Sequence, residues 1–235
     1  MKWLTEGNLE ELKKSVIKEG WYVEDLLRIT TEAFKERNNE LAKQIEDEYW
    51  EVYDEYLSIL NSSQIIVATC NPSGYDLRFI FGSVLISKIL LDISTRLKDI
   101  ASDINLLIRE PELNQSIMLP EMFSFAQKML RKALRIYVDQ NLEGASGVCS
   151  QDATMDGMFT KFNDDIIRII QDNPRLVRRG LLLMDISKAL EEISDFSVQI
   201  IEVTFYVLKG TYHTCFNDNL QPFSLELFRI SNVDR

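Results

Sequence analysis

The sequence matches itself when it is displaced by 100 residues. Across positions 77–100, eight of 24 residues are identical to their partners at 177–200, where unrelated sequences of this composition share roughly one or two. The matches include Arg78 with Arg178 and the tripeptide 86–88 with 186–188. Two amphipathic helices with a common Ile/Leu/Ser pattern are the alternative, but the matched Arg and Lys positions favour an internal repeat.

Glycine and proline are scarce, with 9 and 5 residues among 235, so a turn-rich β sandwich or barrel has too few turn residues. The prolines lie where helices would begin or end. Apolar periodicity and capping residues predict six long helices, and Gly210 is expected to close the last. The expected helices run over about 8–37, 40–68, 76–109, 120–140, 148–171 and 174–209.

Together, the repeat and the six helices predict an all-α fold of two tandem three-helix bundles. We expect the first bundle over residues 1–110, a linker over 111–119, the second bundle over 120–215 and a C-terminal tail over 216–235. The chain is 46% apolar, a composition that is sufficient for a packed core and argues against a disordered chain.

Charge and cysteine usage narrow the function classes. The 26 basic and 37 acidic residues give a net charge of −11, which repels nucleic acid. Cys70, Cys149 and Cys215 stand far apart without a CxxC motif, so we expect neither a zinc knuckle nor a disulfide framework, and we place the protein in a reducing cytoplasm. The single histidine, His213, argues against histidine-dependent zinc hydrolysis or a Ser-His-Asp triad.

Membrane insertion is also disfavoured by the sequence. The N-terminus carries charges every few residues and does not look like a signal peptide. The longest apolar stretch, Phe79–Leu91, is interrupted by Lys88 and followed by Asp92, so it is too short and too charged to span a bilayer. We therefore expect peripheral membrane contact only.

Two acidic pairs with helical spacing are the candidate chemistry. Asp152 and Asp156 are four residues apart on one predicted helix, and Glu191 and Asp195 are four apart on the next. If these helices are antiparallel neighbours, four carboxylates meet in one groove, and Gln199 and Glu202 continue the stripe. Such oxygen ligands suit Fe³⁺, Mg²⁺, Mn²⁺ or Ca²⁺. The alternative is a solvated helix face, because 37 acids give roughly six such pairs by chance.

A family resemblance adds to this interpretation. The segment Leu190–Glu202, continued to Gly210, resembles the signature helix of the PhoU family, the accessory regulators of phosphate-specific transport. The D-x-x-x-D step at Asp152 and Asp156 is similar to the acidic step on the family's preceding helix. The resemblance extends over about residues 9–215 and implies the same tandem-bundle fold. It also implies a multinuclear carboxylate-bound metal cluster, with iron as the first candidate and Mg, Mn, Ca or Zn as alternatives.

The first repeat departs from the family pattern. Leu91 and Thr95 stand where the family has Glu and Asp, and Tyr49 and Tyr53 stand at the acidic positions of the preceding helix. We therefore expect one intact metal cluster, in the second bundle, and a degenerate first site. The acids that remain for that first site are Asp99 and its neighbours Glu48 and Asp92.

Regulation is what the resemblance implies about function. PhoU-like proteins are cytoplasmic adaptors that link a phosphate ABC transporter ATPase to a sensor histidine kinase and hold the phosphate-starvation response off. We therefore expect a metal-binding adaptor, not an enzyme, and exposed apolar positions on long helices favour a homodimer. Two alternatives stay open: a carboxylate-bridged iron enzyme, although its usual Glu-x-x-His motifs are absent, and a metal-free structural adaptor.

Overall fold

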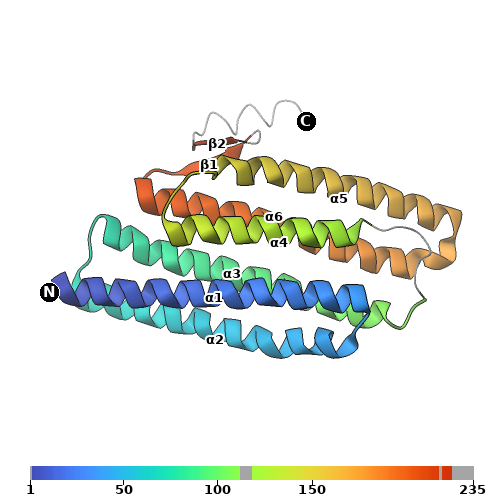
Figure 1. Cartoon of the computed structure of the whole chain (residues 1–235), viewed down its shortest axis with the longest axis horizontal. Helices are drawn as coiled ribbons and strands as arrows, with labels where there is room; N and C mark the ends of the chain where they lie inside the picture. The colour runs from blue at the N-terminus through green and yellow to red at the C-terminus, as the bar shows by residue number, and fades with distance from the viewer. Residues whose placement is uncertain (1, 112–117, 217–218, 224–235) are drawn as a thin grey trace.

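Six α-helices make up most of the computed structural model, which describes residues 2–111, 118–216 and 219–223. They confirm the predicted all-α class. A short 3-10 turn, Pro174–Leu176, precedes the last helix, and a hairpin of β1 (His213–Phe216) and β2 (Asn219–Pro222) follows it (Figure 1). The helices are α1 (Lys2–Glu36), α2 (Asn39–Cys70), α3 (Tyr75–Leu107), α4 (Leu119–Asp139), α5 (Ser146–Asp172) and α6 (Val177–Lys209).

Capping residues set several of the helix ends. The Asn38 side chain accepts hydrogen bonds from the backbone N–H groups of Glu40 and Leu41, at 2.9 and 3.2 Å, and so begins α2. Asn173 accepts from the backbone N–H of Arg175 and begins the turn before α6. Gly210 adopts a left-handed conformation, with φ 73°, and ends α6 as predicted.

The helices form two groups of three. Figure 1 shows α1, α2 and α3 along one side of the molecule and α4, α5 and α6 along the other, with α3 packed against α6 between them. Residues 112–117 of the predicted linker lie outside the described residues, and Leu119, its expected last residue, already belongs to α4.

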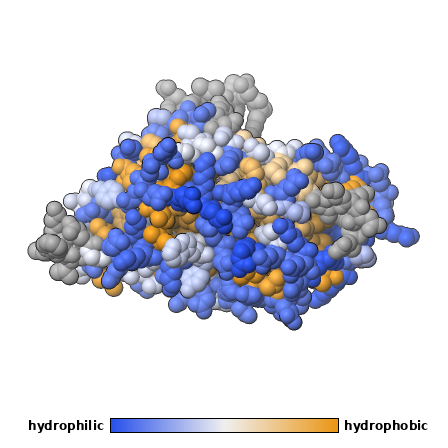
Figure 2. Space-filling model, in the orientation of Figure 1, coloured by the Kyte–Doolittle hydropathy of each residue, from blue (hydrophilic) through white to orange (hydrophobic). Residues whose placement is uncertain are grey.

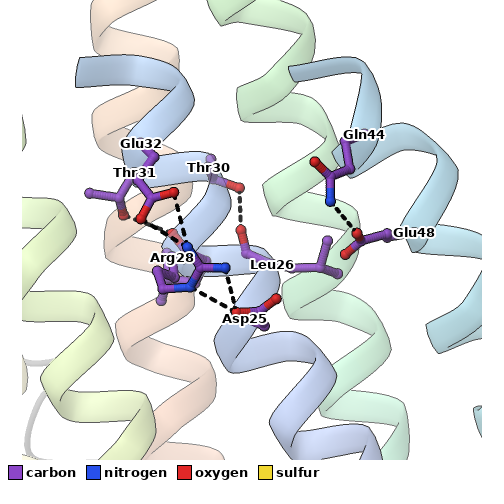
Figure 3. A network of polar contacts seen from close by, with 9 residues as sticks. Asp25, Leu26, Arg28, Thr30, Thr31, Glu32, Gln44 and Glu48 are labelled. Carbon is purple, nitrogen blue, oxygen red and sulfur yellow. Dashed lines mark hydrogen bonds and ion pairs between the residues drawn. The ribbon is translucent and has the colours of Figure 1, made fainter. Parts of the chain in front are cut away.

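The first bundle buries one face of each helix and exposes a charged one. On α2 the buried positions recur with heptad spacing, which keeps them on one side of the helix. On the exposed face of α1, Arg28 pairs with Asp25 and Glu32, each at 2.8 Å (Figure 3). The buried residues of α2 are Ala42, Ile45, Val52, Ile59, Ser63 and Ile66.

The face drawn in Figure 2 is largely hydrophilic, with separate hydrophobic areas. Within the described ranges, no helix is both long and apolar enough to pass through a membrane.

The contact between α3 and α6 is antiparallel and very close. Gly82, near the start of α3, faces Val207, near the end of α6. Further along, the Arg96 side chain forms an ion pair with Glu192 at 2.7 Å. Close approach is possible because Gly82 has no side chain: an added Cβ would overlap the Cγ2 atom of Val207.

A hairpin follows the last helix of the second bundle. We expected the bundle to extend to residue 215 and a tail from 216; α6 ends at Lys209, and two antiparallel strands follow it. Residue His213 pairs with Pro222, and Phe216 pairs with Asn219. Two four-residue strands do not change the all-α class, and residues 224–235 of the predicted tail lie outside the described residues.

We predict that Gly82→Ala destabilises the fold, because an added methyl group would overlap the Val207 side chain. The expected loss in the free energy of unfolding is about 1–3 kcal/mol, measured by urea denaturation. Gly157→Ala is the matched control, since nothing lies within 4 Å of a Cβ there, and it should gain up to about 1 kcal/mol of helix propensity. Equal effects at the two glycines would contradict close packing between α3 and α6.

Candidate functional site

The predicted acidic stripe lies along the boundary between α5 and α6. These helices are antiparallel: Gly180 faces Ile170, and the Ser187 hydroxyl donates to the Asn163 side chain at 3.2 Å. The sequence predicted that the two acidic pairs would meet only if these two helices were antiparallel neighbours, and they are. Asp152 and Asp156 lie on α5, and Glu191 and Asp195 lie on the facing part of α6.

Electrostatic coupling connects three of the four acids. The pKa of the Asp195 carboxyl is raised to about 6, first by partial burial and then by the negative charges of Glu191 and Asp156. Lys188 opposes this shift but does not cancel it. The stripe therefore holds more negative charge than its surroundings neutralise, and its carboxylates attract protons or cations.

Lys188 neutralises one end of the stripe. Its ammonium lies 3.0 Å from a Glu191 carboxylate oxygen and 3.5 Å from Glu192, and the hydrogen bond to Glu191 raises the pKa of Lys188. The same ammonium lies 5.7 Å from the centre of the Phe159 ring on α5. Lys188 thus bridges α5 and α6 at the point where the stripe begins.

The remaining members of the predicted set lie further along the two helices. Asp152 is half-buried, with its Oδ1 shielded from solvent, whereas Gln199 is exposed. Among the residues that the structure describes, no three His, Cys, Asp or Glu side chains converge closely enough to hold a metal ion. The acids thus share one stripe without forming a closed coordination shell.

Glu202 is engaged with the hairpin. Its Oε1 accepts hydrogen bonds from the Thr214 hydroxyl and from the backbone N–H of Cys215, both at 2.8 Å. Cys215 in turn forms a disulfide with Cys149 of α5, with the two Cα atoms 5.5 Å apart. The expectation that the cysteines stand too far apart for a disulfide is therefore wrong for this pair, which the hairpin brings together across 66 positions of sequence.

Asp99, the candidate ligand of the first repeat, lies at the contact between the two bundles. It pairs with Arg96 at 3.0 Å and borders a groove of about 190 Å³ that Asp103, Asp185 and Glu192 also line. Burial, then the charges of Asp185 and Asp99, raise the pKa of the Asp103 carboxyl to about 6. Asp103 and Asp185 escaped the sequence analysis because they are related only by the contact between α3 and α6.

The other first-repeat acids are engaged locally. Glu48 accepts a hydrogen bond from the Gln44 side chain of the same helix at 2.6 Å (Figure 3), and Asp92 forms an ion pair with Lys88. Tyr49 and Tyr53 are in contact with other aromatic rings of α2. The surface of the first repeat that corresponds to the acidic stripe is thus aromatic.

A PhoU domain model matches residues 16–104 and 119–204, one copy in each bundle. The chain belongs to the PhoU family. The phosphate-specific transport system accessory protein PhoU homolog 2 of Thermotoga maritima is 31% identical to it over 225 residues, which cover 95% of each chain. The PhoU homolog of Clostridium acetobutylicum is 26% identical over 212 residues, covering 87% of this chain and 94% of that one.

Solved PhoU structures have the same fold. The crystal structure of PhoU from Pseudomonas aeruginosa superposes with a TM-score of 0.84 at 23% identity, covering 88% of this chain and 99% of that one. PhoU from Streptococcus pneumoniae gives a TM-score of 0.82 at 21% identity, with coverage of 88% and 98%. The named relatives are accessory proteins, which confirms that this PhoU-family chain is not an enzyme.

We predict that Asp195→Asn stabilises this PhoU-family protein at pH 8 more than at pH 4. Because the folded-state pKa is raised to about 6, the wild-type carboxyl favours folding at low pH and loses that contribution as the pH rises through 6. Urea denaturation at the two pH values measures the difference. Gln199→Ala is the control, since it removes a side chain of the same stripe without changing charge, and an equal effect of Asp195→Asn at both pH values would contradict the coupling.

Proposed function

We propose that this protein is a cytoplasmic regulator of phosphate uptake and phosphate-starvation signalling. The observation that carries the proposal is the match of both bundles to the PhoU domain, together with a relative named as an accessory protein of a phosphate-specific transport system. An accessory protein of a transporter acts by association. Its expected partners are therefore the ATPase of a phosphate ABC transporter and, from the family resemblance, the sensor histidine kinase of that system.

The molecule has the properties that an adaptor needs. Its two bundles present long helical faces, and no described helix is suited to spanning a membrane, so any membrane contact would be peripheral and made through partners. A homodimer is part of the proposal. It is supported by Phe81 and Leu181, which occupy equivalent positions of the two repeats and are each 54% exposed.

Metal binding by the second bundle is the second part of the proposal. Its support is the coupled stripe of Asp156, Glu191 and Asp195, in which negative charge is incompletely neutralised, and Asp152, whose position on α5 continues the stripe. Carboxylate donors fit a hard cation, with iron as the first candidate and Mg, Mn, Ca or Zn as alternatives. The bound ion would crosslink α5 and α6, and Gln199 could add an amide oxygen.

Co-purification tests the adaptor function. We expect the chain, expressed at native levels in cells grown with abundant phosphate, to retain the transporter ATPase and the sensor kinase on an affinity column, and mass spectrometry identifies them. A helical protein of similar size and charge, carrying the same tag, controls for non-specific retention. Recovery of the ATPase alone would remove the kinase from the proposal, and recovery of neither would overturn the adaptor function.

Metal content tests the stripe. Protein purified without a chelator or histidine tag should contain iron or another hard cation by mass spectrometry, and Asp152→Ala/Asp195→Ala should lose it about tenfold or more. Asp164→Ala/Asp172→Ala removes the same charge from exposed positions of α5 and should keep the metal. If both variants and the wild type remain metal-free after loading with Fe²⁺ in air, the metal-free adaptor is correct. Oxygen consumption on ferrous addition would instead favour the iron enzyme.

A further inference from the structure

An exposed cluster of aromatic side chains lies on α2 of the first bundle. It occupies the part of the helix that corresponds to the acidic part of α5 in the second bundle. Tyr49, Trp50, Tyr53 and Tyr56 form a continuous series, with ring centres 5.2 Å apart for Tyr49–Trp50, 5.8 Å for Trp50–Tyr53 and 6.5 Å for Tyr53–Tyr56. Trp50 is 61% exposed and Tyr53 is 37% exposed. Tyr49 and Tyr56 pack partly against the core and hold the cluster in place. Exposed aromatic side chains that form one continuous patch are a feature of binding surfaces, whereas a single exposed apolar side chain is not.

This cluster already holds one cation from its own chain. The Lys98 ammonium of α3 lies 4.2 Å from the centre of the Tyr49 ring and 5.7 Å from that of Trp50. Both distances are within the range in which the negative face of an aromatic ring attracts a positive charge. The cluster therefore has the orientation that cation–π binding needs, while most of the Trp50 surface and about a third of the Tyr53 surface stay open.

Negative charge surrounds the exposed indole. Three acidic residues are neighbours of Trp50 on the helix surface. Glu46 is four residues before it, Asp47 is three before it, and Asp54 is four after it. All three are exposed, and none forms an ion pair with another described residue. The positive charges beside these three carboxylates are Lys98 and Lys43, which stands three and four residues before Glu46 and Asp47. The surface is still net negative, which disfavours an acidic partner and favours a basic one.

We propose that Trp50 and Tyr53, with the carboxylates of Glu46, Asp47 and Asp54, form a docking surface for an arginine-bearing segment of a partner protein. Arginine fits better than lysine, because its planar guanidinium can stack on the indole while it donates hydrogen bonds to carboxylates beside the ring. The inference goes beyond the transporter and kinase proposed above. It concerns the first bundle and does not depend on metal binding by the second.

The repeat explains why the two bundles would differ in this way. Tyr49 and Tyr53 occupy the positions that correspond to Asp152 and Asp156, so the same helix surface offers carboxylates in one bundle and aromatic rings in the other. Both surfaces attract positive charge, but rings flanked by acids select an organic cation on a peptide, whereas closely spaced carboxylates suit a metal ion.

Binding of a defined peptide tests the proposal. The probe is a fluorescein-labelled peptide of six Arg-Gly repeats, with the Lys-Gly peptide of equal charge beside it, titrated with the full chain at 150 mM salt and followed by anisotropy. We expect the Arg peptide to bind more tightly than the Lys peptide. Trp50→Ala/Tyr53→Ala should weaken Arg-peptide binding by about tenfold, which lies between the contributions of an exposed and a desolvated cation–π contact.

Matched variants separate this surface from general attraction by an acidic protein. Trp21→Ala removes an indole of α1 that is 68% exposed and should leave binding unchanged. Glu46→Gln/Asp47→Asn/Asp54→Asn should weaken binding, whereas Glu143→Gln/Asp164→Asn/Asp172→Asn, with the same change in net charge, should not. The proposal would be overturned if the two triple charge variants lost binding equally. It would also be overturned if Trp50→Ala/Tyr53→Ala bound the Arg peptide as the wild type does while keeping the wild-type helical circular dichroism spectrum.

Discussion

The antiparallel contact between α3 and α6 determines how the rest of the molecule is arranged. Each of these helices is the third of its bundle, and each uses one face for its own bundle and another for its partner. Gly82 allows the closest approach, against Val207, and the Arg96–Glu192 ion pair adds a polar contact near the middle. Because packed interiors transmit displacements, a change in the separation of α3 and α6 would alter both bundles together.

This contact also connects the candidate site to the first bundle. Glu192 receives the Arg96 guanidinium of α3 on one oxygen and the Lys188 ammonium on the other, and Lys188 in turn binds Glu191 of the acidic stripe. A cation that replaced Lys188 as the partner of Glu191 would change the charge balance at Glu192. The stripe is therefore electrostatically coupled to the interface between the bundles, which gives an adaptor a physical route from ion binding to helix position.

Much of the fold is contained in local sequence signals. Asn38, Asn173 and Gly210 mark helix ends through their own capping hydrogen bonds or backbone conformation, and the displaced match at 100 residues predicts the second bundle from the first. The sequence also predicts that the two acidic pairs face each other, because four-residue spacing puts each pair on one side of its helix and a short connection makes the two helices antiparallel. Spacing does not predict which side chains a helix presents to the other bundle, so the meeting of Asp99 with Asp103 and Asp185 was missed.

Two further features lay outside the reach of pattern analysis. The hairpin has four residues in each strand, too few for periodicity to distinguish from a loop, and without the hairpin nothing brings Cys215 to Cys149. At Glu19 the sequence gives two conflicting signals. Its position between Val16 and Val23 predicts that it lies on the buried face of α1, whereas its charge predicts that it is exposed. The structure buries it completely, and burial raises the pKa of its carboxyl to about 9.

If the second bundle binds a metal ion and the first docks an arginine-bearing segment, as proposed above, the duplicated surfaces give one fold two binding chemistries. Tyrosine in place of an acid on α2 removes a candidate metal ligand but leaves the helix surface exposed and its backbone helical. Since the neighbouring acids Glu46, Asp47 and Asp54 remain, the negative potential of the surface also remains, and the rings add an apolar component to it. On the proposals made above, a first bundle that lacks the metal ligands would still bind a positively charged group at this surface, because the neighbouring carboxylates keep it negative.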